Sequence, residues 1–165
     1  MSPWVLNMRR TLVTGTSRAP IEFSLLHQIT PDFRIGAEWM PRDQRLSGIW
    51  TWRIAEATDT TPAVVLGQGT AWPSSEVSGY AYSLSFAQPI SQQLSAYLSF
   101  SYLANENIWR VPGGAVWRFS PEWSTKVMWD GRKLHPFITR HFDDWEVSLL
   151  MLDGETLTLA TSYIF

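Results

Sequence analysis

Bulky apolar residues alternate with small or polar residues in short segments along most of the chain. The clearest segments are 80–87 and 94–102, where bulky residues such as Tyr82, Leu84 and Phe86 alternate with Ser and Ala. Successive side chains of a β-strand point to opposite faces, so this period of two predicts strands with one bulky face and one small-residue face. Helical periodicity is almost absent. The pattern therefore predicts an all-β protein.

Turn signals separate these segments at short intervals. Asp130-Gly131 and Asp153-Gly154 are typical of tight hairpins, and Thr30-Pro31-Asp32 is typical of a turn. We count about 12 (10–12) short strands, each roughly seven to eleven residues long, which suits a tilted membrane strand. No linker marks a second domain, so we expect one domain over residues 1–165. Pro136 inside one segment predicts a bulge.

The predicted architecture is an antiparallel up-and-down meander closed into a transmembrane barrel. Closure removes the unpaired edges that a large open sheet would expose. The residues opposite the bulky face are mostly small and uncharged, whereas a soluble barrel would show charge on its outside. The bulky face is therefore expected to meet lipid, and the small-residue face is expected to line the interior.

Residues 155–165 form the most specific segment of the chain. Its bulky register ends on a carboxyl-terminal aromatic and contains Leu157, Leu159, Tyr163 and Phe165. The segment resembles the closing strand of bacterial outer-membrane β-barrels, whose terminal Phe and alternating apolar positions the barrel-insertion machinery reads. The resemblance implies a porin-like protein of the Gram-negative outer membrane, with membrane lipid and the insertion machinery as partners. It assigns no particular family and no functional residues.

The topology of such barrels places both termini in the periplasm. Counting back from Phe165, the turns at 16–20, 41–44, 71–78, 105–107, 130–131 and 153–154 would lie outside, and those at 30–32, 56–62, 88–93, 120–122 and 142–144 would face the periplasm. Several tryptophans lie near these turns, and indole favours the headgroup boundary because it combines an apolar body with one N–H donor. The predicted interface aromatics are Trp39, Trp50, Trp109, Trp123, Trp129 and Trp145. The alternative is that they fill a soluble β core.

Charged residues recur on the small-residue face and would converge on the lumen. This predicted set consists of Glu22, Arg34, Glu38, Arg53, Arg118, Lys126, Asp130 and Arg140. In a barrel, opposite charges can pair there away from lipid. The set predicts either a salt-bridge network that plugs a narrow barrel or a charged constriction of a pore.

Composition narrows the function classes. The chain has 165 residues, 10 tryptophans and a net charge of −2, so no basic field indicates a nucleic-acid partner. Cysteine is absent, which excludes disulfides, thiolate zinc sites and cysteine nucleophiles. No stretch approaches the roughly 20 apolar residues of a membrane helix. Residues 1–11 lack the apolar run of a signal peptide, although an outer-membrane protein needs an export signal.

Candidate chemistry centres on His27, His135 and His141. His135 and Ser124 lie on neighbouring predicted strands with Asp130 between them, which permits a Ser–His hydrolase hypothesis. The spacing of His135 and His141 does not predict a metal site. The glycine pairs at 67–69 and 113–114 lack the features of phosphate loops, so no cofactor is expected.

Three functional hypotheses follow. The first is a small integral outer-membrane barrel with a structural, complex-forming or minor channel role, alone or in a homo- or hetero-oligomer. The second is a soluble lipocalin-like barrel that binds an apolar ligand, with the bulky face turned inward. The third is an outer-membrane lipid acyl hydrolase. The direction in which Tyr82, Leu84 and Phe86 point distinguishes the first hypothesis from the second.

Overall fold

The computed structural model describes residues 3–13, 21–42, 44–70 and 79–165, and its regular structure is all β. Within these residues, no helix is long and apolar enough to cross a membrane. The strands are β1 (Trp4–Thr11), β2 (Ile21–Gln28), β3 (Phe33–Met40), β4 (Arg45–Ala55), β5 (Ala63–Thr70), β6 (Tyr80–Pro89), β7 (Leu94–Leu103), β8 (Ile108–Arg110), β9 (Gly113–Arg118), β10 (Trp123–Trp129), β11 (Leu134–His141), β12 (Trp145–Leu152) and β13 (Thr156–Ile164).

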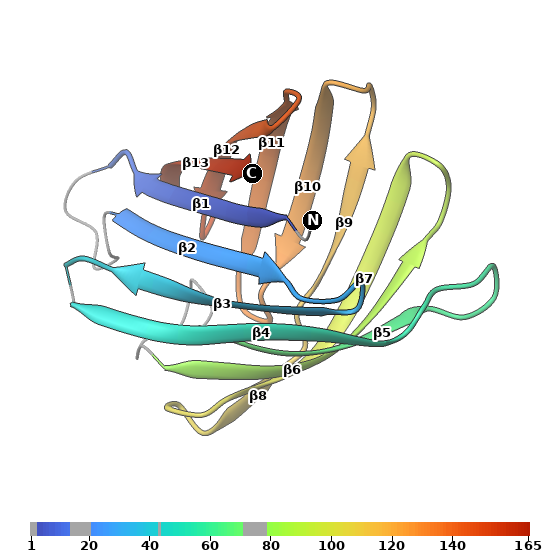
Figure 1. The fold of residues 1–165 in the computed structure, drawn as a ribbon, viewed down its shortest axis with the longest axis horizontal. Coiled ribbons are helices and arrows are strands. Elements are labelled where there is room, and N and C mark those ends of the chain that lie inside the picture. Colours follow the sequence, from blue (N-terminus) through green and yellow to red (C-terminus); the bar gives the residue numbers. More distant parts are fainter. Residues whose placement is uncertain (1–2, 14–20, 43, 71–78) are drawn as a thin grey trace.

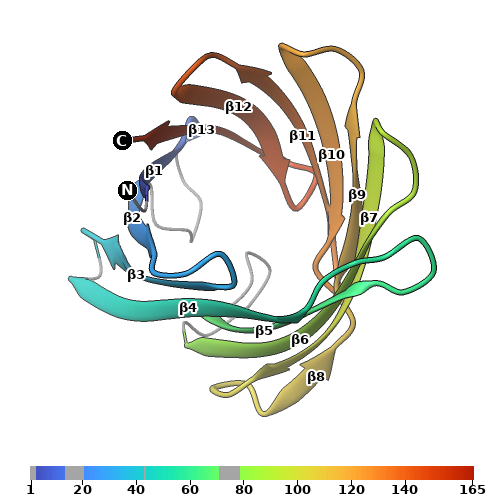
Figure 2. The same cartoon turned by 45° about the vertical axis from the view of Figure 1, so that its right-hand side comes forward.

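The strands form one antiparallel sheet that closes on itself (Figures 1 and 2). β13 pairs with β12 on one side and with β1 on the other, which completes the ring. β8 and β9 pair with different parts of β7. They are two pieces of one strand, separated by residues 111–112, and together they take one place in the ring. The ring therefore has 12 strand positions, and the predicted meander barrel is confirmed.

The faces of the sheet agree with the predicted alternation. Across β6 and β7, Leu84 opposes Phe100 and Ser83 opposes Ser101. Phe100 is 46% exposed and Ser101 is 0% exposed, so the bulky register points outward and the small register points inward. Small side chains on the inner face leave space inside the closed barrel, where side chains from all strands converge.

The closing segment occupies the predicted register. Leu157, Leu159 and Tyr163 lie in the same register as outward residues of β1 and β12, including Leu6 and Trp145. The rings of Trp145 and Tyr163 lie 4.5 Å apart, and those of Tyr163 and Phe165 lie 5.7 Å apart. These three aromatic rings thus lie in contact on the outside of the sheet where β12 and β13 meet.

The two ends of the barrel carry different turns. The terminal end holds both described chain ends, joined by hydrogen bonds between Trp4 and Phe165, and the turns at 30–32, 120–122 and 142–144. The far end holds the hairpins at 130–133 and 153–155. The predicted turns at 16–20 and 71–78 lie outside the described residues.

The predicted bulge at Pro136 is wrong. β11 keeps a continuous register with β10 through Pro136, and its pairing with β12 begins only at Phe137. Pro136 has no N–H to donate, and it lies just before the point where β11 begins to pair with β12. The register instead shifts between Arg53 and Ala55 of β4.

Candidate functional site

In the described part of the barrel, an inner wall of mixed polar and apolar residues borders two open cavities. The larger has a volume of about 450 Å³ and is lined by residues that include Glu22, Glu38 and Lys126. The smaller has a volume of about 310 Å³ and lies at the terminal end, beside Ser124 and His141. The side chains that face these two cavities are the first candidates for chemistry in the described part of the interior.

Three residues of the predicted lumen set face the larger cavity, each with different surroundings. Glu22 forms an ion pair with Arg9 of β1, a residue that the predicted lumen set did not include. Lys126 lies 5.1 Å from the centre of the Phe137 ring and 6.0 Å from that of Tyr97. Glu38 Oε1 is buried without a hydrogen-bond partner among the described residues. The wall is thus a mixed-charge lining rather than one neutralised pair.

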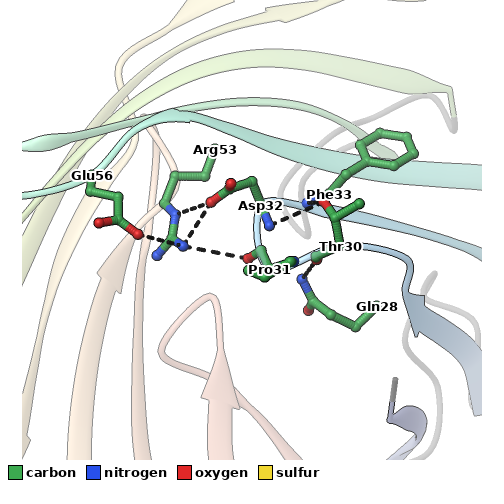
Figure 3. Close-up of polar contacts among 7 residues, drawn as sticks. All are labelled: Gln28, Thr30, Pro31, Asp32, Phe33, Arg53 and Glu56. Carbon is green, nitrogen blue, oxygen red and sulfur yellow. Dashed lines mark hydrogen bonds and ion pairs between the residues drawn. The ribbon is translucent and has the colours of Figure 1, made fainter. Parts of the chain in front are cut away.

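Arg53 lies at the rim of the terminal end rather than deep in the lumen (Figure 3). Its guanidinium lies 2.7 Å from Asp32 and 3.0 Å from Glu56. The turn that holds Asp32 is fixed by Thr30 Oγ1, which accepts the backbone N–H of Phe33 at 3.0 Å. These groups are well exposed, so the ion pairs fasten the rim only weakly.

The other members of the predicted lumen set are dispersed. Arg34 donates to Gln28 at 3.1 Å on the inner register, and Arg118 lines the smaller cavity. Asp130 is fully buried at the far end.

The predicted inward position of Arg140 is wrong. Arg140 is in register with Trp123 and Val147, which share the outer face. Its guanidinium lies 5.5 Å from the Trp123 ring and 5.0 Å from that of Phe142. A single-residue error in the register of a short strand moves every side chain to the other face, and Pro136 obscured the register here.

His135 belongs to a sealed cluster at the far end. Its ring is 0% exposed, and its Nε2 lies 2.9 Å from Asp130 Oδ2. Its Nδ1 accepts the backbone N–H of Asp153 at 2.9 Å. Asp130 Oδ1 also accepts the backbone N–H groups of Arg132 and Lys133. His135 thereby joins the two Asp-Gly hairpins that the sequence predicts.

Asp130, His135 and Asp153 also bring potential metal ligands within 4.8 Å of one another. The tautomer of His135 argues against a metal ion. Because Nδ1 accepts a backbone N–H, the neutral ring carries its proton on Nε2, the nitrogen that faces Asp130. Ligation through Nε2 would require the ring proton on Nδ1, where it would face the backbone N–H of Asp153. The hydrogen bonds of the cluster therefore fit a clamp between two hairpins better than a metal site.

The predicted Ser124–His135 pair does not form. Ser124 Oγ instead lies 2.7 Å from Nε2 of His141, and Nδ1 of His141 lies 3.0 Å from Oε1 of Glu146. The sequence analysis named both histidines but did not identify Glu146. The available signal was the inner register, because Ser124, His141 and Glu146 all occupy positions of the small-residue face.

The predicted interface tryptophans all lie in the outward register. Trp39, Trp129 and Trp145 are 42–49% exposed, and Trp109 is 73% exposed. Trp123 begins β10 at one end of the barrel, and Trp129 ends the same strand at the other. Trp50 differs, since it lies in the middle of β4 and its indole N–H donates to Gln68 at 3.3 Å.

No protein-family model matches the chain, and no curated protein matches it. The site must therefore be interpreted from its own geometry.

Proposed function

We propose that the chain is an integral outer-membrane β-barrel. The observation that supports this most strongly is the direction of the tryptophans. Of the 10 in the sequence, nine lie in described residues, and by register all nine occupy outward positions: Trp4, Trp39, Trp50, Trp52, Trp109, Trp117, Trp123, Trp129 and Trp145. A soluble barrel gains stability by burying such residues, whereas a membrane barrel gains it by turning them toward lipid.

The distribution of charge supports the same proposal. Within the described strands, the outward register carries only two charged residues, Arg10 and Arg140, each one residue from a strand end. Charges at the bilayer midplane destabilise a barrel far more than charges near its interfaces. Water-soluble monomers rarely expose apolar patches above a few hundred Å². An apolar girdle with charge only at its margins fits a hydrocarbon layer.

The interior fits a narrow polar passage better than a site for an apolar ligand. Its lining includes Arg9, Glu22, Glu38 and Lys126 around the larger cavity. A lipocalin-like binder would need an apolar interior. The proposed role is therefore a small structural barrel with minor channel activity, in which the Arg9–Glu22 pair narrows the lumen.

Quenching of tryptophan fluorescence tests the membrane placement. The purified protein is refolded into vesicles with or without brominated acyl chains, which quench only indoles in contact with the hydrocarbon. We expect strong quenching by brominated lipid and weak quenching by aqueous iodide, because the described indoles face outward. Extraction in aqueous buffer without detergent, together with full iodide quenching, would instead support a soluble barrel.

Conductance across planar bilayers tests the channel role. We expect small ion currents, with Lys126→Glu shifting the permeability ratio toward cations because a charge on the lumen wall sets ion selectivity. Arg140→Gln is the matched control, since this charge lies on the outer face and should leave the ratio unchanged. A protein that inserts but carries no current would have a closed interior and only a structural role.

A further inference from the structure

Three neighbouring strands place a serine, a histidine and a carboxylate in line at the terminal end of the lumen. Ser124 is the second residue of β10, His141 the last of β11 and Glu146 the second of β12. The distances are 2.7 Å from Ser124 Oγ to His141 Nε2 and 3.0 Å from His141 Nδ1 to Glu146 Oε1. Both distances lie within the range for proton transfer between a nucleophile, a base and an orienting acid.

The tautomer of His141 is the one that a nucleophilic serine requires. An ionised Glu146 carboxylate only accepts hydrogen bonds, so it holds the ring proton on Nδ1. Nε2 then keeps its lone pair and accepts the Ser124 hydroxyl proton. A serine that only stabilised the inner wall would not need a histidine with a defined tautomer as its partner. Ser85 and Ser99, which pair hydroxyl to hydroxyl at 2.7 Å, show that simpler arrangement.

The serine faces a cavity that could hold a small substrate. Ser124 and His141 line the open cavity of about 310 Å³ together with residues 91–93 of the β6–β7 turn. This volume lies at the lower end of the range for ligand pockets. Among the described lining residues, Arg118 is the one permanent cation, and it is the cross-strand neighbour of Ser124. Opposing residues on one face lie close enough for Arg118 to reach a group bound at Ser124.

We propose that Ser124, His141 and Glu146 form a hydrolytic triad for small, water-soluble esters that carry a negative charge. Ser124 Oγ attacks the ester carbonyl carbon and passes its proton to His141 Nε2, while Glu146 stabilises the imidazolium. The carbon–oxygen bond to the alcohol then breaks, and the proton on Nε2 moves to the departing oxygen. Water attacks the resulting acyl-Ser124, gives its proton to Nε2, and releases the acid as the serine regains the proton.

The position of the triad limits the substrate class. Ser124 is 6% exposed and points into the lumen, so a substrate must enter from the aqueous mouth rather than from the bilayer. Arg118 lines the same cavity opposite Ser124 and therefore favours a substrate that carries an anionic group. The proposal uses only the inner face, so it does not depend on the membrane placement.

Two ester substrates and a fluorophosphonate probe test the triad in the refolded full chain. We expect the probe to label Ser124, and we expect turnover of both p-nitrophenyl butyrate and the anionic mono-p-nitrophenyl succinate. Ser124→Ala and His141→Asn should each reduce turnover at least 1,000-fold, and Glu146→Gln should reduce it at least 10-fold. Arg118→Gln should remove about a tenfold preference for the anionic ester and leave the neutral ester largely unaffected.

Ser148→Ala is the matched control, because Ser148 lies on the same inner wall but pairs with Thr139 at 2.7 Å instead of with a histidine. It should retain wild-type turnover. The far-ultraviolet circular dichroism spectrum shows whether each variant keeps the all-β fold. The proposal would be overturned by equal turnover in the wild type and Ser124→Ala, or by a folded wild type that the probe does not label. Either result would count regardless of what the tryptophan fluorescence shows about lipid contact.

Discussion

Two histidines on β11, six residues apart, occupy opposite ends of the barrel and have opposite hydrogen-bond patterns. His135 is sealed at the far end, where its Nδ1 accepts the backbone N–H of Asp153. His141 borders a cavity at the terminal end, where its Nδ1 faces Glu146 and its Nε2 faces Ser124. Each ring lies beside a carboxylate, but only His141 has a free lone pair directed at a hydroxyl group.

This difference shows that the partner of one ring nitrogen decides what the other can do. A backbone N–H on Nδ1 forces the proton of His135 onto Nε2 and makes the ring a brace between hairpins. A carboxylate on Nδ1 leaves Nε2 of His141 basic. The far end should therefore account for stability and the terminal end for chemistry.

Replacing each histidine in turn separates these roles and gives the largest expected effect on stability. His135→Ala should lower the free energy of unfolding by about 3 kcal/mol, because the buried Asp130 carboxylate loses one of its partners and a cavity remains. His141→Ala should cost only about 1 kcal/mol, since water can replace its hydrogen bonds. Urea unfolding followed by tryptophan fluorescence measures both. The folded fraction of His135→Ala should keep its ester hydrolysis, and equal losses of stability would remove the distinction.

The two Asp-Gly hairpins that His135 joins provide a smaller and sharper test. Gly131 has a φ of +90°, and a Cβ there would lie 2.6 Å from Arg110 Cβ. Gly154 has a φ of +71°, with its nearest contact at 4.0 Å. Gly131→Ala should cost about 2 kcal/mol through backbone strain and crowding together, and Gly154→Ala about 1 kcal/mol through backbone strain alone. The same urea titration measures both losses of stability. A larger loss for Gly154→Ala than for Gly131→Ala would show that the side chains around Gly131 can move to accommodate a Cβ.

Much of the fold could be predicted from the chain before any coordinates were considered. The period of two assigned Leu84, Phe100 and Leu157 to one face because side-chain alternation is a local property of extended backbone. The Asp130-Gly131 and Asp153-Gly154 turns were equally readable, since positive φ favours glycine. Prediction failed at Pro136 and Arg140, where the proline hid the register of a short strand.

The candidate chemistry was only partly predictable. Ser124 and a neighbouring histidine were visible in the sequence, but His135 was named as the partner instead of His141. Both histidines occupy the same register of β11, so alternation could not separate them. The stagger between β10 and β11 places His141 near Ser124, and the turn at 142–144 brings back Glu146.

The sequence by itself determined which side chains share a face, because that depends only on the geometry of an extended chain. Tertiary structure decided which of them meet, because hydrogen-bond register and closure of the ring link residues from different strands. Arg9 meets Glu22, and Ser124 meets His141, only once neighbouring strands have paired at one fixed offset.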